Sequence, residues 1–128
     1  MDWIFRSDQP IYTQLTQRLS EAIVAGAFAP GERLPSVREL AVEAGVNPNT
    51  VQRALAELER EGLVFSQRTA GRFVTENENM ITNARLRLAD ERVERFLRSM
   101  KKLGCDRREV LALIAAAKED DDYEYSGM

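Results

Sequence analysis

The sequence contains no histidine. Histidine is the commonest general base and the commonest zinc ligand, so its absence weakens enzymatic and zinc-binding interpretations alike. The single cysteine, Cys105, excludes an internal disulfide and a thiolate-rich metal site, and a chain of this kind is expected in the reducing cytoplasm. We therefore expect no cofactor and no metal, and nothing in the sequence favours an enzyme.

Long apolar runs are also missing. The longest, Ala22–Ala29 and Val110–Ala117, hold eight residues each, far fewer than the roughly 20 that span a bilayer. The start, Met1–Arg6, has an acid where a signal peptide has a base, and no apolar core follows it. With 44% hydrophobic residues and a net charge of −3, we expect a globular protein without a membrane partner, and not a polycation that coats nucleic acid.

Two helices are predicted in the first third of the chain by apolar spacing and by their end signals. The first follows Pro10, carries apolar residues at helical spacing and ends near Ala25. The second begins at Ser36, whose spacing from Glu39 is that of a capping box, and it stops at Gly45.

A third helix is predicted immediately after this stop. Asn47 is a favourable N-cap, Pro48 suits the first helical position because its missing N–H would have no partner there, and Gly62 closes the helix. Two helices joined by a glycine-containing turn, each with an apolar inner face, are the helix-turn-helix arrangement.

Two short strands, Leu63–Phe65 and Arg72–Val74, are predicted next. Their β-branched and aromatic residues, and the glycine that ends the intervening turn, favour a hairpin. A hairpin directly after a helix-turn-helix is the wing of a winged helix. We therefore predict a mainly α protein with a small β-hairpin, in which residues 1–75 form a winged helix-turn-helix domain.

The polar residues of this domain are distributed as a DNA-binding surface requires. A recognition helix enters the major groove by its N-terminal end; base-reading and phosphate-binding side chains lie at that end here, and the acidic side chains lie at the other. The expected DNA-binding residues are Ser36, Arg38, Asn47, Pro48, Asn49, Thr50, Gln52, Arg53, Arg68, Thr69, Gly71 and Arg72. Each one alone also suits a cap or a solvated surface, and a winged helix can instead bind proteins, but their order along the chain favours duplex DNA.

Four segments of this domain match one known signature: PGERLPSVRELA from Pro30, NPNTVQRA from Asn47, LEREGLV from Leu58 and RTAGRFV from Arg68. Together they resemble the GntR family of bacterial transcription regulators, over Pro10 to Val74. The resemblance implies a winged-helix repressor that binds a palindromic operator as a homodimer. By motif position it also implies that Arg38 and Arg53 contact DNA and that Gly71 lies at the wing tip.

Residues 76–128 are predicted to form a two-helix dimerisation hairpin with an acidic tail. Apolar residues recur every seven positions along the first of these helices, and Asp106 opens the second with a capping-box pattern. The expected dimer-interface residues are Leu86, Ala89, Val93, Phe96, Leu97, Met100, Leu103, Val110, Leu113 and Ile114. Left exposed, they would form an apolar patch that a soluble monomer rarely tolerates; the alternative is that this face packs on its own chain.

This short second segment resembles the YtrA subfamily, because residues 76–128 are too few for the larger effector domains of most GntR proteins. The sequence identifies no small-molecule effector; one remains an open alternative, since a dimer interface could build a small cavity between two such hairpins. Cys105 is expected to be a small turn residue rather than a redox switch, since no second cysteine exists.

Two charged stretches lie in the second half of the chain. The basic stretch Arg85–Arg108 is expected to be solvated or to pair with the acidic run Glu119–Glu124. We expect that acidic run to be a solvated tail rather than a cation site.

Overall fold

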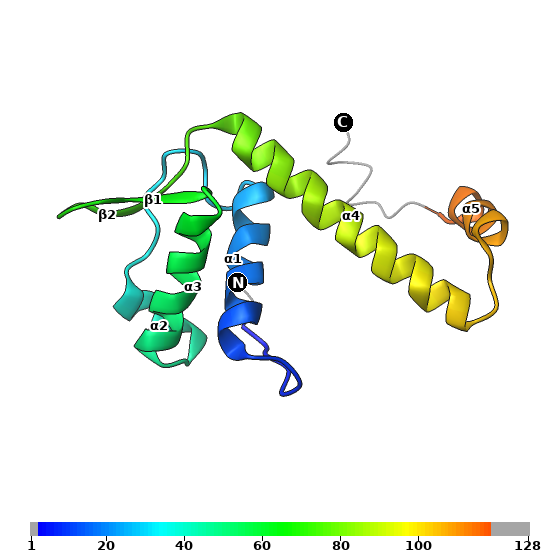
Figure 1. The fold of residues 1–128 in the computed structure, drawn as a ribbon, viewed down its shortest axis with the longest axis horizontal. Helices are drawn as coiled ribbons and strands as arrows, with labels where there is room; N and C mark the ends of the chain where they lie inside the picture. Colours follow the sequence, from blue (N-terminus) through cyan, green and yellow to red (C-terminus); the bar gives the residue numbers. More distant parts are fainter. Residues whose placement is uncertain (1–2, 119–128) are drawn as a thin grey trace. The chain divides into compact units, whose positions relative to one another are not determined.

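The fold is known from a computed structural model that describes residues 3–118, so the predicted acidic tail lies outside the described residues. Its elements, shown in Figure 1, are α1 (Ile11–Val24), α2 (Val37–Ala44), α3 (Pro48–Arg60), β1 (Val64–Gln67), β2 (Gly71–Val74), α4 (Glu78–Lys102) and α5 (Arg107–Ala116). The predicted fold class, mainly α with one small antiparallel hairpin, is confirmed. The chain divides into two compact units, one ending at Leu88 and the other beginning at Ala89.

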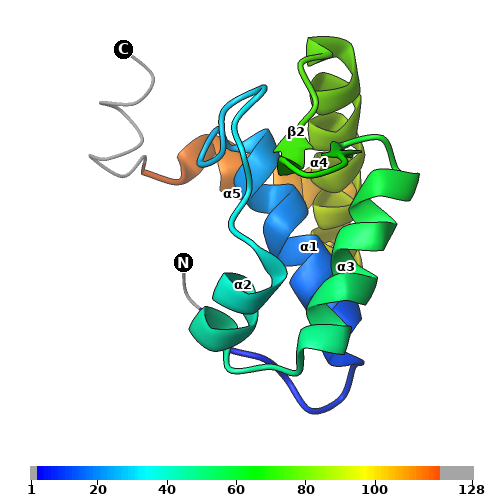
Figure 2. The same ribbon diagram turned by 90° about the vertical axis from the view of Figure 1, so that its left-hand side faces the viewer.

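The core of the first unit lies between three helices. Leucines at helical spacing on α1 and α3 belong to one buried cluster, to which α2 contributes Leu40. Figure 2 shows α1, α2 and α3 as neighbouring helices. Leu15, Leu19 and Leu58 are fully buried. Full burial of a leucine side chain contributes about 1.5–3 kcal/mol, so this apolar contact sets the position of α3 on the domain.

The ends of the two middle helices are fixed by the side chains that the sequence predicts. Ser36 Oγ accepts from the Glu39 backbone N–H at 3.1 Å, and the Glu39 carboxylate accepts from the Ser36 N–H at 3.1 Å. The hydrogen bond from the Ser36 backbone N–H, followed by the Ser36 side chain, holds the pKa of the Glu39 carboxyl below its ordinary value. Asn47 Oδ1 accepts from the Asn49 N–H at 2.8 Å with Pro48 in the first turn. Both caps satisfy backbone donors that the helices leave unpaired.

The hairpin is longer than the sequence predicts and is joined by a third segment. Its register pairs Val64 with Val74 and Gln67 with Gly71, whereas the prediction ended the first strand two residues earlier. The outer edge of β2 bonds residues 31–34: the Leu34 N–H donates to the Arg72 carbonyl at 2.9 Å. The sequence gives little sign of this pairing, because prolines flank the segment on both sides and a glycine opens it.

Helix α4 contributes to both units. Ile81 and Ala84, in its first turns, are buried in the core of the first unit, and the predicted boundary after residue 75 remains a prediction. In the second unit, the Asp106 carboxylate accepts from the Glu109 N–H at 2.9 Å and caps α5 as predicted. Among the described residues, no helix is both long enough and apolar enough to cross a bilayer.

Candidate DNA-binding interface

The first half of α3 presents a polar face to solvent. Val51, Ala54 and Leu55 point into the core, so the intervening positions must point outward on a helix of 3.6 residues per turn. The predicted residues on this outward face are Asn47, Pro48, Asn49, Thr50, Gln52 and Arg53, of which Thr50 is half-buried and the rest are exposed. The structure therefore brings these six together on one surface.

Arg53 does not extend freely into solvent. Its guanidinium lies over the ring of Tyr12 on α1, with Cζ 3.6 Å from the ring centroid. This distance is well within the range of a cation–π contact. The two residues form part of a shallow depression that is lined by Ile11, Tyr12, Asn49, Thr50 and Arg53. Tyr12 is not among the residues predicted from the sequence, because no local feature of α1 indicates that the Tyr12 side chain faces α3.

The start of α2 carries an exposed cation. Arg38 is exposed in the first turn of α2, where the helix N-terminus also favours an anion. Ser36 and Asn47 lie where predicted, but a side-chain oxygen of each already accepts the cap hydrogen bond. Their structural role as caps is therefore established by geometry, and any DNA contact comes in addition.

The wing carries exposed polar residues at its turn. Arg68 and Thr69 lie in the exposed turn between the strands, as predicted. Gly71 begins β2 with a φ of +107°, and a Cβ at this position would lie 3.1 Å from Arg33 Nε. Both observations favour glycine there. They also place Arg33, which the sequence analysis left out, beside the predicted wing residues.

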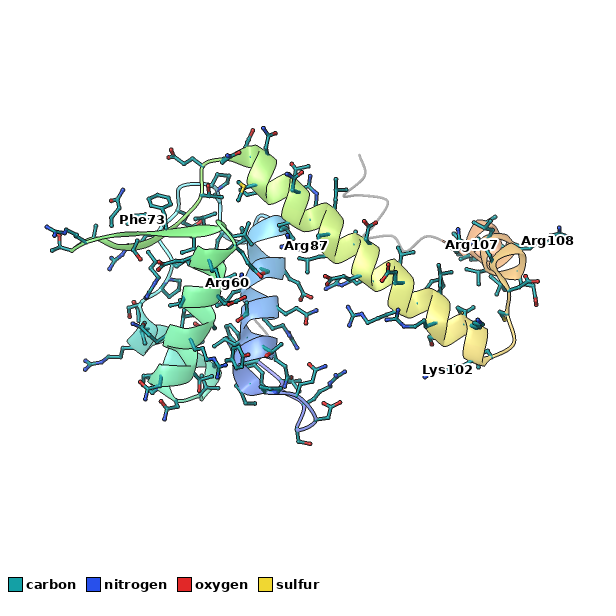
Figure 3. The ribbon with its side chains drawn as sticks, in the orientation of Figure 1. Arg60, Phe73, Arg87, Lys102, Arg107 and Arg108 are labelled. Carbon is teal, nitrogen blue, oxygen red and sulfur yellow. The ribbon has the colours of Figure 1, made fainter. Side chains whose placement is uncertain are left out.

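Arg72 faces α3, the predicted recognition helix. Its Nε donates to Glu59 Oε1 at 2.7 Å, and the same oxygen accepts from Ser66 Oγ at 2.5 Å. The Ser66 hydroxyl, followed by Arg72, holds the pKa of the Glu59 carboxyl below its ordinary value. In Figure 3 Arg60 marks the end of α3 on one side of the hairpin and Phe73 extends from the other side. The structure thus separates Arg72 from the exposed residues of the wing turn.

The acidic end of α3 is partly neutralised. Arg60 pairs with Glu57 one turn earlier on the same helix, and this contact lowers the pKa of the Glu57 carboxyl and raises that of the Arg60 guanidinium. The acidic residues and this ion pair lie at the C-terminal end of α3, away from the polar residues at its start, in agreement with the charge distribution of the sequence.

Most of the predicted dimer residues on α4 and α5 are exposed apolar side chains. Val93 and Phe96 are 54% and 42% exposed, and Leu113 and Ile114 of α5 are exposed to a similar degree. Leu86, Ala89 and Leu103 are also exposed, while Leu97 and Met100 are half-buried. Val110 differs, because it is buried within its own chain at the α4–α5 turn.

Cys105 is half-buried in the turn before α5. Within residues 3–118, no group of three or more histidine, cysteine, aspartate or glutamate side chains could hold a metal ion.

Three packed helices, an exposed polar start of the third helix and a hairpin with a basic turn define a winged helix-turn-helix DNA-binding domain. A family model described as bacterial regulatory proteins, gntR family, matches residues 11–74. The chain belongs to the GntR family and is a DNA-binding transcription regulator.

Relatives with known names and structures agree with this membership. The transcriptional repressor YtrA of Bacillus subtilis is 39% identical over 93 residues, which are 72% of each chain. A GntR-family regulator from Listeria monocytogenes has a similar structure with a TM-score of 0.81, at 35% identity over 89% of this chain and 100% of that one. The AraR DNA-binding domain, solved with its operator ORX1, aligns with a TM-score of 0.55, at 28% identity over 59% of this chain and 96% of that one.

Proposed function

We propose that this protein is a transcriptional repressor that binds a palindromic operator as a homodimer. The observation that carries the proposal is the exposed polar face at the start of α3; the same domain also exposes Arg38 on α2 and the polar wing turn. YtrA, which matches 72% of this chain, is named a repressor, and the AraR domain that is similar to this one was solved with its operator. We also place the protein in the cytoplasm, where bacterial DNA is found.

In this proposal the start of α3 enters the major groove. Asn49, Gln52 and Arg53 read base edges, and Thr50 and Arg38 bind phosphate oxygens, because these side chains have the donors and acceptors that each task needs. Arg68 and Thr69 of the wing reach the backbone or the adjacent minor groove. The caps Ser36 and Asn47, with Pro48 and Gly71, shape the surface that approaches the DNA.

The exposed apolar face of α4 and α5 supports the homodimer. Its members are apolar, most of them are large, and they recur at heptad spacing along α4. Burial against a second copy removes this surface from water, and two-fold symmetry presents two winged helices to half-sites about one helical turn apart. An effector is not required by this proposal, and a cavity between the paired helices is where we would look for one.

Selection from a random duplex library at physiological salt tests the proposal. The purified full chain is incubated with the library, and the retained DNA is sequenced. We expect enrichment of a two-fold symmetric motif with a fixed half-site spacing. Enrichment of a single half-site would contradict the homodimer, and absence of any enriched sequence would favour a protein-binding winged helix.

The stack of Arg53 on Tyr12 gives a second prediction. We expect Tyr12→Leu to lower operator affinity by about two- to fivefold, because loss of a cation–π contact of about 0.5–1 kcal/mol lets the Arg53 side chain move. Tyr12→Phe keeps the ring and is the matched control. Titration of labelled operator by fluorescence anisotropy measures both. Equal losses in the two variants would assign the effect to the Tyr12 hydroxyl and contradict the role of the ring.

A further inference from the structure

One carboxylate on α3 holds both strands of the wing. Glu59 Oε1 accepts from Ser66 Oγ on β1 at 2.5 Å and from Arg72 Nε on β2 at 2.7 Å. Ser66 and Arg72 are directly opposite each other in the hairpin register. Both side chains therefore leave the same face of the hairpin, at the same distance from its turn, and meet at one atom of the recognition helix.

The Arg72 side chain also extends along α3. Its Nη1 lies 3.5 Å from Gln52 Oε1, and Gln52 precedes Glu59 by two helical turns on the same face. The side chains of Arg72 and Glu59 are only 23% and 32% exposed. A charge-assisted hydrogen bond that is partly shielded from water is stronger than an exposed ion pair.

The inner and outer halves of the wing are held in different ways. At the base, Val64 and Val74 are buried in the core, and β2 bonds residues 31–34. Farther out, Phe65 and Phe73 stack on the face away from α3, with ring centroids 5.8 Å apart, and residues 65–70 are exposed. A two-stranded hairpin is marginally stable by itself. The Leu34 N–H bonds the Arg72 carbonyl on the outer edge of β2, and the side-chain contacts with Glu59 add a second attachment, which also includes β1.

We infer that Glu59 is a positioning residue for DNA binding, which fixes the wing against the recognition helix through Ser66 and Arg72. Arg72 accordingly acts as the ligand of Glu59 and not as a phosphate contact, which revises its predicted role. An ordered wing holds Arg68 and Thr69 at a set distance from the base-reading side chains, so less conformational freedom is lost on binding. This inference rests on the proposed operator binding.

Four variants of the full chain test the inference: Glu59→Ala, Arg72→Ala, the double variant and the control Glu57→Ala. The control removes the same charge from the same helix, but Glu57 pairs with Arg60 and does not contact the wing. Amide hydrogen exchange without DNA is the first readout. We expect faster exchange in residues 65–73 of the Glu59→Ala protein, unchanged exchange in α1, and no change in the control.

Operator affinity is the second readout. We expect Glu59→Ala and Arg72→Ala each to weaken binding by about three- to tenfold, as for loss of one or two hydrogen bonds. The double variant should bind the operator no more weakly than the weaker-binding single variant, because both substitutions remove the same contact between Glu59 and Arg72. The dependence of affinity on salt should stay close to that of the unaltered protein.

Two results would overturn the inference. One is unchanged hydrogen exchange in the wing of Glu59→Ala. The other is a loss of affinity for Arg72→Ala alone, with a salt slope smaller by about one unit, which is the signature of a lost phosphate contact. If the unaltered chain selects no DNA, the proposed function fails and the DNA-binding role of Glu59 fails with it, even where the exchange data show that Glu59 holds the wing.

Discussion

Replacement of Phe96 by glutamate is expected to convert the protein into a monomer and to weaken operator binding by about 100-fold. Phe96 lies within the exposed apolar face of α4, with Val93 one turn away. In a two-fold dimer each substitution occurs twice in the interface, and burial of an unpaired carboxylate costs several kcal/mol. Without the dimer, the second half-site no longer adds to the affinity of the first, and that gain is typically about 10²–10⁴-fold.

Sedimentation equilibrium and operator titration measure this prediction directly. Arg98→Glu is the matched control, because position 98 is exposed and lies on the opposite side of α4 from Phe96. It introduces a larger change of charge without touching the apolar face. We expect the control to remain dimeric. A dimeric Phe96→Glu protein with native helix content would contradict the assignment of this face to the dimer.

Loss of the two arginines on the DNA-facing surface is expected to have the next largest effect. We expect Arg38→Ala and Arg53→Ala each to weaken operator binding by about 1–3 kcal/mol, as for side chains that contact bases or phosphates. The two are exposed and lie on different helices, so their losses should add in the double variant. A phosphate contact also lowers the salt slope by about one unit, whereas a base contact relaxes specificity at one position.

Arg60→Ala provides the control on the same recognition helix. Arg60 lies at the end of α3 away from the polar face and pairs with Glu57. Its removal should leave operator affinity and salt dependence nearly unchanged. Unaltered binding by a folded Arg38→Ala, Arg53→Ala double variant would reject the assignment of these residues to the interface.

Local rules of the sequence predict the helices of this protein well. The capping pairs Ser36–Glu39 and Asp106–Glu109 and the cap Asn47 are confirmed with their hydrogen bonds, because a cap needs only residues that are close in the chain. The hairpin is predicted with shorter strands, since the pairing of β2 with residues 31–34 depends on chain that is distant in sequence.

The sequence likewise predicts one part of the candidate site and not the other. The exposed start of α3 follows from helical periodicity, which assigns Val51, Ala54 and Leu55 to the core and leaves the polar residues outside. The contacts of Tyr12 with Arg53 and of Glu59 with Arg72 join different elements. No spacing rule within one element predicts them, because they exist only once α1, α3 and the wing have packed.

The sequence by itself determined the family, the order of the elements and which residues of α3 form its exposed polar face, since caps, periodicity and the four signature segments are local properties of the chain. Only the tertiary structure decided what the charged residues of that surface do. Arg53 rests on an aromatic ring, and Arg72 is held by a carboxylate. Val110 is buried at the α4–α5 turn, while its predicted partners Leu113 and Ile114 remain exposed. Side chains of one type diverge in role because burial and partners are set by contacts between elements, and a linear pattern does not contain those contacts.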